Sequence, residues 1–210
     1  MPGVPAFNGR ELDLELLDAR SVPLCRLFRH PNGEWDPPPV VHRTLRVDPP
    51  TAHGHRYAVL YTSDQLPCVA AECRVLSIDQ LDRWSYHAGK AKDYQVARYS
   101  FAAPALFIPI DGPNARHLGL DGESRLFDGK AYEPYQEVGL ELFTRYGEMV
   151  HGLSWASFHR NQLGRVYAIW HHRKASMQLA RPIARFTALE ADPEWLAFLA
   201  KWPSIRPVSP

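Results

Sequence analysis

A single carboxylate, Glu72, interrupts a stretch of mostly apolar residues over positions 66–76 whose pattern favours a helix. A carboxylate buried in such a stretch is costly unless it is paired or takes part in chemistry. Glu72 could form an ion pair with Arg74 or with a more distant arginine, or it could face water. The alternative is that Glu72 belongs to a site that requires a carboxylate.

Arginine side chains precede Glu72 in two segments. Arg26 stands inside the apolar strand pattern Val22–Phe28, as either an edge residue that reaches water or a positioned clamp for an anion. Arg43 and Arg46 lie on or beside the apolar island of the irregular segment 30–55, which is rich in Pro, His and Gly. An irregular segment of this length is typical of a lid, a binding loop or disorder.

Serine and histidine offer a second kind of chemistry. Gly152–Ala156 differs by one residue from the G-x-S-x-G motif of serine hydrolases, and His159, His171 or His172 could act as the base for Ser154. That motif needs a strand before the serine and a helix after it, whereas here a helix pattern precedes and a strand pattern follows. The sequence therefore disfavours a serine hydrolase.

Metal ligands and disulfides are not indicated. The histidines show no HExxH spacing, and His171 and His172 would point to opposite faces of a strand. Cys25, Cys68 and Cys73 are an odd number without a CxxC pair, so we interpret them as small buried hydrophobic residues. We expect no metal.

The composition describes a chain that can bury one sizeable core. It has 210 residues, 45% of them hydrophobic, and 24 basic against 23 acidic residues give a net charge of +1. This balance argues against nucleic-acid binding and against a basic membrane-binding patch. The N-terminus lacks the pattern of a signal peptide and no apolar run is long enough to cross a membrane, so we expect a cytoplasmic protein.

The elements that would position the candidate residues follow from local patterns. A strand closed by Tyr61 leads through Ser63 and Asp64 into the helix of Glu72, with Pro67 in its first turn. We further expect strands at 22–28, 94–101, 105–110 and 165–170, with Pro109 at a sheet edge or strand end and 165–170 in the interior of a sheet. Turns are expected over 111–130, and a helix from Glu133 to about Val150, ended by Gly152. The segment 11–20 could form either a strand or helical turns.

A last helix is signalled by Asp192 as its N-cap and Pro193 at its first position. Its apolar side would be formed by Trp195, Leu196, Leu199 and Trp202. This side could pack on the core or offer a surface to a partner.

Taken together and in order, these segments resemble the RES domain family, named for its arginine, glutamate and serine. The resemblance rests on the segments 25–28, 45–50, 59–63, 70–72 and 152–157, with the helix from Gln136 leading into the last of them. It covers residues 22–173, with 1–21 as an N-terminal extension and 174–210 as a C-terminal extension that contains a short helix. Thr44–Leu45 replaces the glycine pair of the family, which leaves Arg43 as an alternative to Arg46, and Ala156 replaces the usual proline. The loop between Arg46 and Tyr61 is long, so the entrance to the pocket can differ from that of the family.

The resemblance implies a mixed α/β fold like that of ADP-ribosyltransferases, a single domain with a central β-sheet core and flanking helices. It implies an enzyme that degrades NAD by phosphorolysis or hydrolysis at the nicotinamide ribose, as the toxin of a bacterial type II toxin-antitoxin pair. Two alternatives are a protein ADP-ribosyltransferase that uses the same pocket and a catalytically silent module that binds a nucleotide or a partner.

The resemblance also implies roles for five residues, with NAD as the substrate. Glu72 would stabilise an oxocarbenium-like state near the ribose 2-hydroxyl, and Arg26 and Arg46 would hold the pyrophosphate. Tyr61 would stack on nicotinamide or orient the ribose, and Ser157 would hydrogen-bond a ribose or phosphate oxygen.

Other expectations concern the acceptor and the partners. If inorganic phosphate is the acceptor it needs a cation, and Arg29, Arg43 and His159 remain alternatives. The family implies a small antitoxin that covers the NAD cleft, and a homo-oligomer is a further possibility. We expect no nucleic acid and no membrane as partners.

Overall fold

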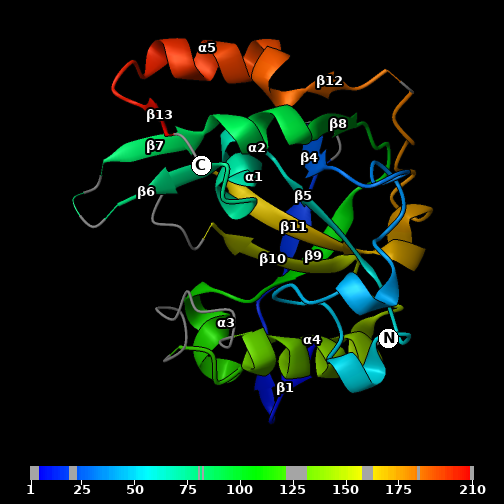
Figure 1. Ribbon diagram of the computed structural model, residues 1–210. Helices are drawn as coiled ribbons and strands as arrows, with labels where there is room; N and C mark the ends of the chain where they lie inside the picture. The colour runs from blue at the N-terminus through cyan, green and yellow to red at the C-terminus, as the bar shows by residue number, and fades with distance from the viewer. Residues whose placement is uncertain are drawn as a thin grey trace.

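The core of the protein is a strongly twisted mixed β-sheet (Figure 1). The computed structural model describes residues 5–18, 23–79, 81, 83–121, 132–157, 163–183 and 185–208. The sheet has eight strands in the order β12-β8-β4-β5-β11-β10-β9-β3. The strands are β3 (Glu15–Leu17), β4 (Leu24–Phe28), β5 (Val59–Ser63), β8 (Gln95–Tyr99), β9 (Ala105–Pro109), β10 (Gly152–Ala156), β11 (Arg165–Trp170) and β12 (Thr187–Ala188). Only the β9–β10 pair is parallel among these pairs.

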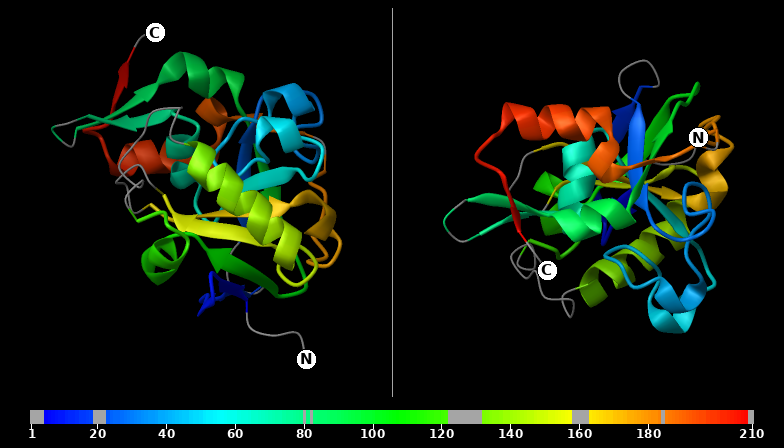
Figure 2. Two further views of the ribbon diagram at one scale, coloured as in Figure 1. Left: turned by 90° about the horizontal axis from the view of Figure 1, so that it is seen from below. Right: turned by 45° about the horizontal axis from the view of Figure 1, so that its top comes forward.

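Helices flank this sheet in two groups. They are α1 (Leu66–Glu72), α2 (Ala88–Asp93), α3 (Gly112–His117), α4 (Glu133–Tyr146) and α5 (Pro193–Lys201). Helices α1, α2 and α5 lie beside β4 and β8, whereas α3 and α4 lie beside β9 and β10 (Figure 1). The left view of Figure 2 shows α4 running across β10 and β11. The expected mixed α/β fold with a central sheet and flanking helices is confirmed.

The interior position of β11 is also confirmed. Its residues Val166–Trp170 are all buried, as their nearly continuous apolar pattern predicts, and β11 lies between β5 and β10. The first residue of β10, Gly152, has to be a glycine, because a Cβ at this position would clash with the backbone oxygen of Ala168 in β11. Pro109 is the last residue of β9, which satisfies the strand-end alternative.

The helix around Glu72 is shorter than predicted. Helix α1 ends at Glu72, and Arg74 follows with a φ of 54°. The Val75 N–H then donates to the Ala70 oxygen at 2.8 Å, a bond that closes a helix of this kind at its C-terminus. Leu76 therefore opens a strand, and Glu72 stands at the end of the helix instead of inside it.

The helix α4 also ends earlier than predicted. It ends at Tyr146, and the Gly147 N–H caps it by donating to the Phe143 oxygen at 2.8 Å. Residues 147–151 then turn so that 152–156 can join the sheet. The expectation that Gly152 ends the helix was wrong because Gly147 had already done so.

Two further expectations need correction. The segment 111–130 contains helix α3 instead of turns alone, while positions 122–131 lie outside the described residues. Asp192 caps α5 as predicted, accepting hydrogen bonds from two backbone N–H groups. The predicted apolar side of α5 is wrong in part, however, because Trp195 is buried whereas Leu196 and Trp202 are each 49% exposed.

The remaining elements are short. Of the segment 11–20, residues 19 and 20 lie outside the described residues. The rest contributes Glu11 to β2 (Arg10–Glu11), which pairs with β1 (Ala6–Phe7), and forms β3 in the central sheet, so the strand alternative is confirmed there. A second sheet, which the sequence did not predict, joins β6 (Leu76–Ile78), β7 (Trp84–His87) and β13 (Arg206–Val208). Short 3-10 helices cover Val40–His42, Thr51–His53, His171–Lys174 and Leu189–Ala191. Within the described ranges, no helix combines the length and apolar character needed to span a membrane.

Candidate functional site

The candidate site lies where the central sheet separates into two halves. Strand β4 pairs along its full length with β8, and β5 pairs along its full length with β11. Between β4 and β5, in contrast, a single pair is in register, Cys25 with Ser63. Beyond this pair the strands diverge, and a cavity of about 670 Å³ opens beside them. This volume is typical of a small-molecule site.

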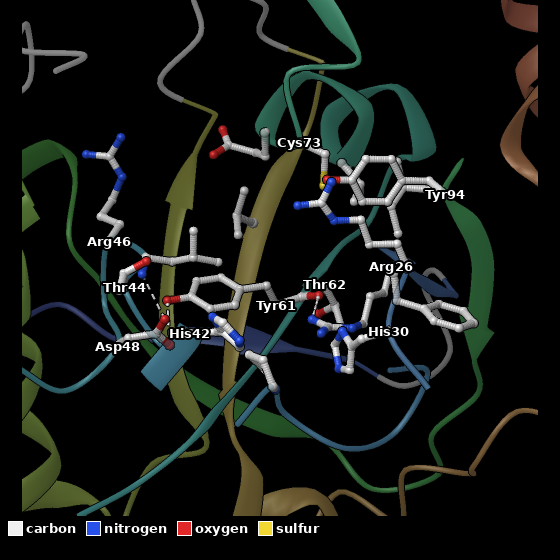
Figure 3. Close-up of a pocket in the computed structure, with 18 of the residues that line it drawn as sticks. Arg26, His30, His42, Thr44, Arg46, Asp48, Tyr61, Thr62, Cys73 and Tyr94 are labelled. Carbon is white, nitrogen blue, oxygen red and sulfur yellow. Dashed lines mark hydrogen bonds between the residues drawn. The ribbon is translucent and has the colours of Figure 1, made fainter. Parts of the chain in front are cut away.

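Arg26 enters this cavity from β4 (Figure 3). Its side chain is only 7% exposed, and its guanidinium donates from Nε to the Gly33 oxygen at 2.8 Å and from Nη1 to the Tyr61 oxygen at 3.1 Å. Both partners are neutral carbonyls, and Arg26 forms no ion pair with any carboxylate that the structure describes. A buried guanidinium held in this way keeps a positive charge that suits an anion.

Arg46 lines the same cavity from the opposite side. Its guanidinium carbon lies 4.9 Å from the ring centre of Tyr132 and 4.8 Å from that of Tyr135. Stacking on aromatic faces fixes the plane of an arginine while leaving its charge in place. The two tyrosines come from the start of α4, so this helix helps to position Arg46.

Arg43, the alternative to Arg46, has a different environment. It does not line the cavity, and its guanidinium donates to the backbone oxygens of Pro38, Gly54 and Tyr57 at 3.0–3.2 Å. These bonds tie the long loop 38–57 to itself. Of the two arginines, the structure brings Arg46 to the cavity and uses Arg43 to hold the loop.

Tyr61 lies at the floor of the cavity and contacts a residue that the sequence analysis missed. Its hydroxyl donates to Asp48 Oδ1 at 3.2 Å and accepts from the Val47 N–H at 3.3 Å. Burial raises the pKa of Tyr61 well above its usual value, so the hydroxyl stays protonated. Asp48 also lines the cavity and is only 3% exposed. In the sequence, Asp48 stood within the segment 45–50 that resembles the family, but it was assigned no role; its location two residues after Arg46 was the signal that could have pointed to the site.

Glu72 and Ser157 meet at another wall of the cavity. The Ser157 hydroxyl donates to Glu72 Oε1 at 2.7 Å, joining the end of β10 to the end of α1. Glu72 lines the cavity, whereas Ser157 is buried behind it and is not one of the lining residues. The structure therefore places Ser157 where it orients the carboxylate, instead of directly in the cavity.

The remaining wall carries further basic and aromatic groups. The guanidinium carbon of Arg29 lies 5.7 Å from the ring centre of Tyr94, and both residues line the cavity with His30 and His42. Arg29 is thus the phosphate-binding candidate that the structure brings to the cavity, while His159 lies outside the described residues. In the described ranges, no group of three or more His, Cys, Asp or Glu side chains could hold a metal ion.

Ser154 does not form a hydrolase site. It is fully buried in β10, and its hydroxyl donates to Glu15. His171 and His172 lie in a 3-10 helix, where they contact the backbone oxygens of Trp35 and Gly147 at 3.1 and 3.2 Å. Neither of these two histidines contacts Ser154 in the structure, and the third candidate base, His159, lies outside the described residues.

Comparison with known proteins identifies the family. The family model described as the RES domain matches residues 23–192, which covers β4 to the N-cap of α5 and all the cavity residues described above. No curated protein and no solved structure matches the chain. The division of the chain at residues 22 and 173 stays a prediction.

Proposed function

The chain belongs to the RES domain family, which is associated with enzymes that act on NAD, and we propose that it cleaves NAD at the nicotinamide ribose. One observation carries this proposal. A single cavity gathers Arg26, Arg46, Tyr61 and Glu72 from four separate segments of the chain, with Ser157 bonded to the glutamate.

Each group has a function in this proposal. Arg26 and Arg46 bind the pyrophosphate of NAD, because a guanidinium matches phosphate oxygens bidentately. The aromatic and apolar walls accept the two rings of the dinucleotide, which is the usual composition of a cofactor-sized pocket. NAD is the substrate, and the proposed reaction uses no metal.

The reaction breaks the bond between C1 of the ribose and the ring nitrogen of nicotinamide. The bonding electrons go to nitrogen, so nicotinamide leaves as a neutral molecule and positive charge develops on the ribose. Glu72 stabilises this charge, and the bond from Ser157 holds its carboxylate in place before the charge develops. An oxygen of phosphate or water then bonds to C1 and releases its proton. Arg29 would bind phosphate if it is the acceptor.

The test is incubation of the purified protein with NAD, with and without inorganic phosphate, followed by separation of the products. We expect nicotinamide together with phosphorylated ADP-ribose if phosphate is the acceptor, or ADP-ribose if water is. Glu72→Gln should lower turnover by about 10³-fold. Glu148→Gln is the matched control, because this glutamate is 86% exposed and does not line the cavity.

Other outcomes would point to the alternative functions. NAD that is consumed only when a protein acceptor is added would indicate an ADP-ribosyltransferase. NAD that binds and stays intact for hours would indicate a silent binding module. A Glu72→Gln variant with full turnover would contradict the role proposed for the carboxylate.

We further propose that the protein acts as a bacterial toxin that a small antitoxin inhibits by covering the cavity. The cavity rim supports a covering partner, because Val41 is 75% exposed and Leu45 49% exposed at its edge. Induced expression in bacteria should lower cellular NAD and stop growth, and Glu72→Gln should not. An antitoxin that restores growth should lose this effect when Val41 is replaced by Asp.

A further inference from the structure

We propose that Asp48 is a positioning residue that locks Tyr61 and the turn carrying Arg46 into one unit, and so sets the affinity of the site for the dinucleotide. This inference deepens the proposed function and rests on it.

The turn is closed by Asp48 from two sides. The Leu45 N–H donates to Asp48 Oδ2 at 2.8 Å, and the Asp48 N–H donates back to the Leu45 oxygen at 3.2 Å. Arg46 lies between these two residues, so its backbone is held within a ring of two hydrogen bonds. The direction in which Arg46 leaves the turn depends on the Asp48 carboxylate.

The second oxygen of the carboxylate joins the turn to the cavity floor. Asp48 Oδ1 accepts from the Tyr61 hydroxyl at 3.2 Å, and this hydroxyl accepts from the Val47 N–H at 3.3 Å. Figure 3 shows Asp48 and the Tyr61 hydroxyl facing each other below Arg46. Asp48 therefore accepts from the Leu45 N–H with one oxygen and from the Tyr61 hydroxyl with the other. An asparagine has a single side-chain oxygen and could not accept in this way.

Other contacts of the turn hold it from outside the cavity. The Tyr57 hydroxyl donates to the Val47 oxygen at 3.1 Å, and Gln136 Nε2 donates to the Leu45 oxygen at 2.9 Å. These bonds fix the turn to the chain before β5 and to α4. Inside the cavity, the turn is fixed to the Tyr61 hydroxyl by the Asp48 carboxylate and by the Val47 N–H.

The Asp48 carboxylate is more deeply buried than closing a turn requires. A carboxylate that is 3% exposed and forms no ion pair with the described residues is expensive to bury. Burial raises its pKa, although the bonds from Leu45 and Tyr61 oppose this effect. Asp79 closes a turn with bonds to two backbone N–H groups at 2.8 and 2.9 Å while it remains exposed. A buried carboxylate is needed only if it must also reach Tyr61.

The hydrogen bonds of the Tyr61 hydroxyl also determine what Tyr61 can offer to a ligand. Because its hydroxyl already donates to Asp48 and accepts from Val47, the side chain presents its ring to a ligand instead of a hydroxyl proton. Loss of Asp48 would leave the Tyr61 hydroxyl without its acceptor and would loosen the Arg46 turn at the same time. We therefore expect the KM for NAD to change more than kcat.

The experiment is a double-mutant cycle with Asp48→Ala, Tyr61→Phe and the double variant, measured by the kinetics of NAD cleavage. We expect KM to rise about tenfold in Asp48→Ala and about fivefold in Tyr61→Phe, with kcat within about threefold of wild type. The double variant should resemble Asp48→Ala alone instead of multiplying the two effects. Asp48→Asn, which keeps one acceptor oxygen, should fall between Asp48→Ala and wild type.

Two control variants address merely structural effects. Tyr167→Phe removes the hydroxyl of a buried tyrosine that donates to Glu15 at 2.8 Å outside the cavity, and Asp79→Ala opens an exposed turn. Both should leave KM within about twofold of wild type.

Urea unfolding of the same variants measures the coupling between Asp48 and Tyr61 without NAD. Wild-type protein that leaves NAD intact while the unfolding cycle shows coupling would overturn the proposed function but support the lock. Coupling in unfolding with an unchanged KM in Asp48→Ala would show a purely structural Asp48 and overturn the inference. Independent effects of the two substitutions in both measurements would overturn it as well.

Discussion

Two adjoining strands each carry a tyrosine that donates to a carboxylate, but the charges around the two pairs are arranged differently. On β11, Tyr167 donates to Glu15 at 2.8 Å, and Arg165 pairs with Glu15 at 3.0 Å and with Asp111 at 3.2 Å. On β5, Tyr61 donates to Asp48 at 3.2 Å in the cavity.

Two charged side chains of the cavity, Arg26 and Asp48, are held mainly by neutral groups. Arg26 bonds to two backbone carbonyls, and neither Arg26 nor Asp48 forms an ion pair with the residues that the structure describes. Around Arg165, by contrast, one guanidinium forms ion pairs with two carboxylates, those of Glu15 and Asp111. Charges that are paired in this way stabilise the fold, whereas charges held by neutral groups remain able to bind a ligand.

Between these two regions, the largest expected effect is on stability and comes from Arg165→Met. This substitution leaves Glu15 and Asp111, which are 22% and 24% exposed, without their common partner. We expect the free energy of unfolding to fall by about 3 kcal/mol, measured in urea. The exposed pair of Arg83 with Asp79 provides the control, and Arg83→Met should leave the unfolding midpoint unchanged. A loss from Arg165→Met no greater than the control would mean that the cluster is effectively solvated.

Arg26→Met should show the opposite pattern. It removes a guanidinium that forms no ion pair with the carboxylates the structure describes, so the unfolding free energy should fall less than in Arg165→Met. The kcat/KM for NAD should fall by about 100-fold, which corresponds to about 2.7 kcal/mol. Steady-state kinetics and urea unfolding of both variants provide the comparison. A large loss of stability with unchanged kcat/KM would place Arg26 with Arg165 as a structural residue.

Much of the sheet could be predicted from local sequence patterns. The apolar strands at 22–28 and 165–170 and the cap at Asp192 are encoded by neighbouring residues, and all three formed close to the predicted positions. The strand β13 was missed because Arg206–Val208 contains a proline and is too short for alternation to show. Leu196 and Trp202 were misplaced because the apolar count of α5 does not show which side meets the core.

The site was predictable by residue type but not by contact. Arg26, Arg46, Tyr61 and Glu72 came from the ordered motifs of the family, and the structure brings them to one cavity. The bond from Ser157 to Glu72 depends on how β10 and α1 approach each other, which no local pattern specifies. Asp48 was missed because its partner Tyr61 is distant in the sequence and its neighbours resemble an ordinary turn.

A smaller effect concerns the pH dependence of stability, where the two regions should differ in sign. The pKa of Asp48 is raised by burial, so the folded protein takes up this proton before the unfolded chain does. Burial also acts on Asp192, but the bonds from Arg98 and two backbone N–H groups outweigh it and lower the pKa. The unfolded value for both is about 3.9.

The sign of each contribution follows from these shifts. For Asp48, the stability of the fold rises as the pH falls from the raised folded pKa to about 3.9, because protonation removes a buried charge. Asp48→Asn should abolish this rise. For Asp192, the contribution is present above about pH 3.9 and lost below it, so Asp192→Asn should flatten the acid loss. Urea unfolding between about pH 6 and pH 2.5 measures both slopes. Slopes of the same sign would mean that Asp48 is paired like Asp192.

The smallest expected effect concerns the Cys73 thiol, which lines the cavity and whose pKa responds to burial and to the charge of Arg26. Burial raises the pKa of Cys73 to about 12, even though Arg26 acts to lower it. At pH 8 only about one thiol in 10⁴ would then be ionised, and the thiolate is the reactive form. We expect iodoacetamide at about pH 8 to leave NAD cleavage unchanged over an hour, and Cys73→Ala to stay within about twofold of wild type. Rapid inactivation that Cys73→Ala abolishes would show that the positive charge of Arg26 outweighs burial at this wall. The cavity would then hold its charges closer together than the comparison with the Arg165 cluster implies.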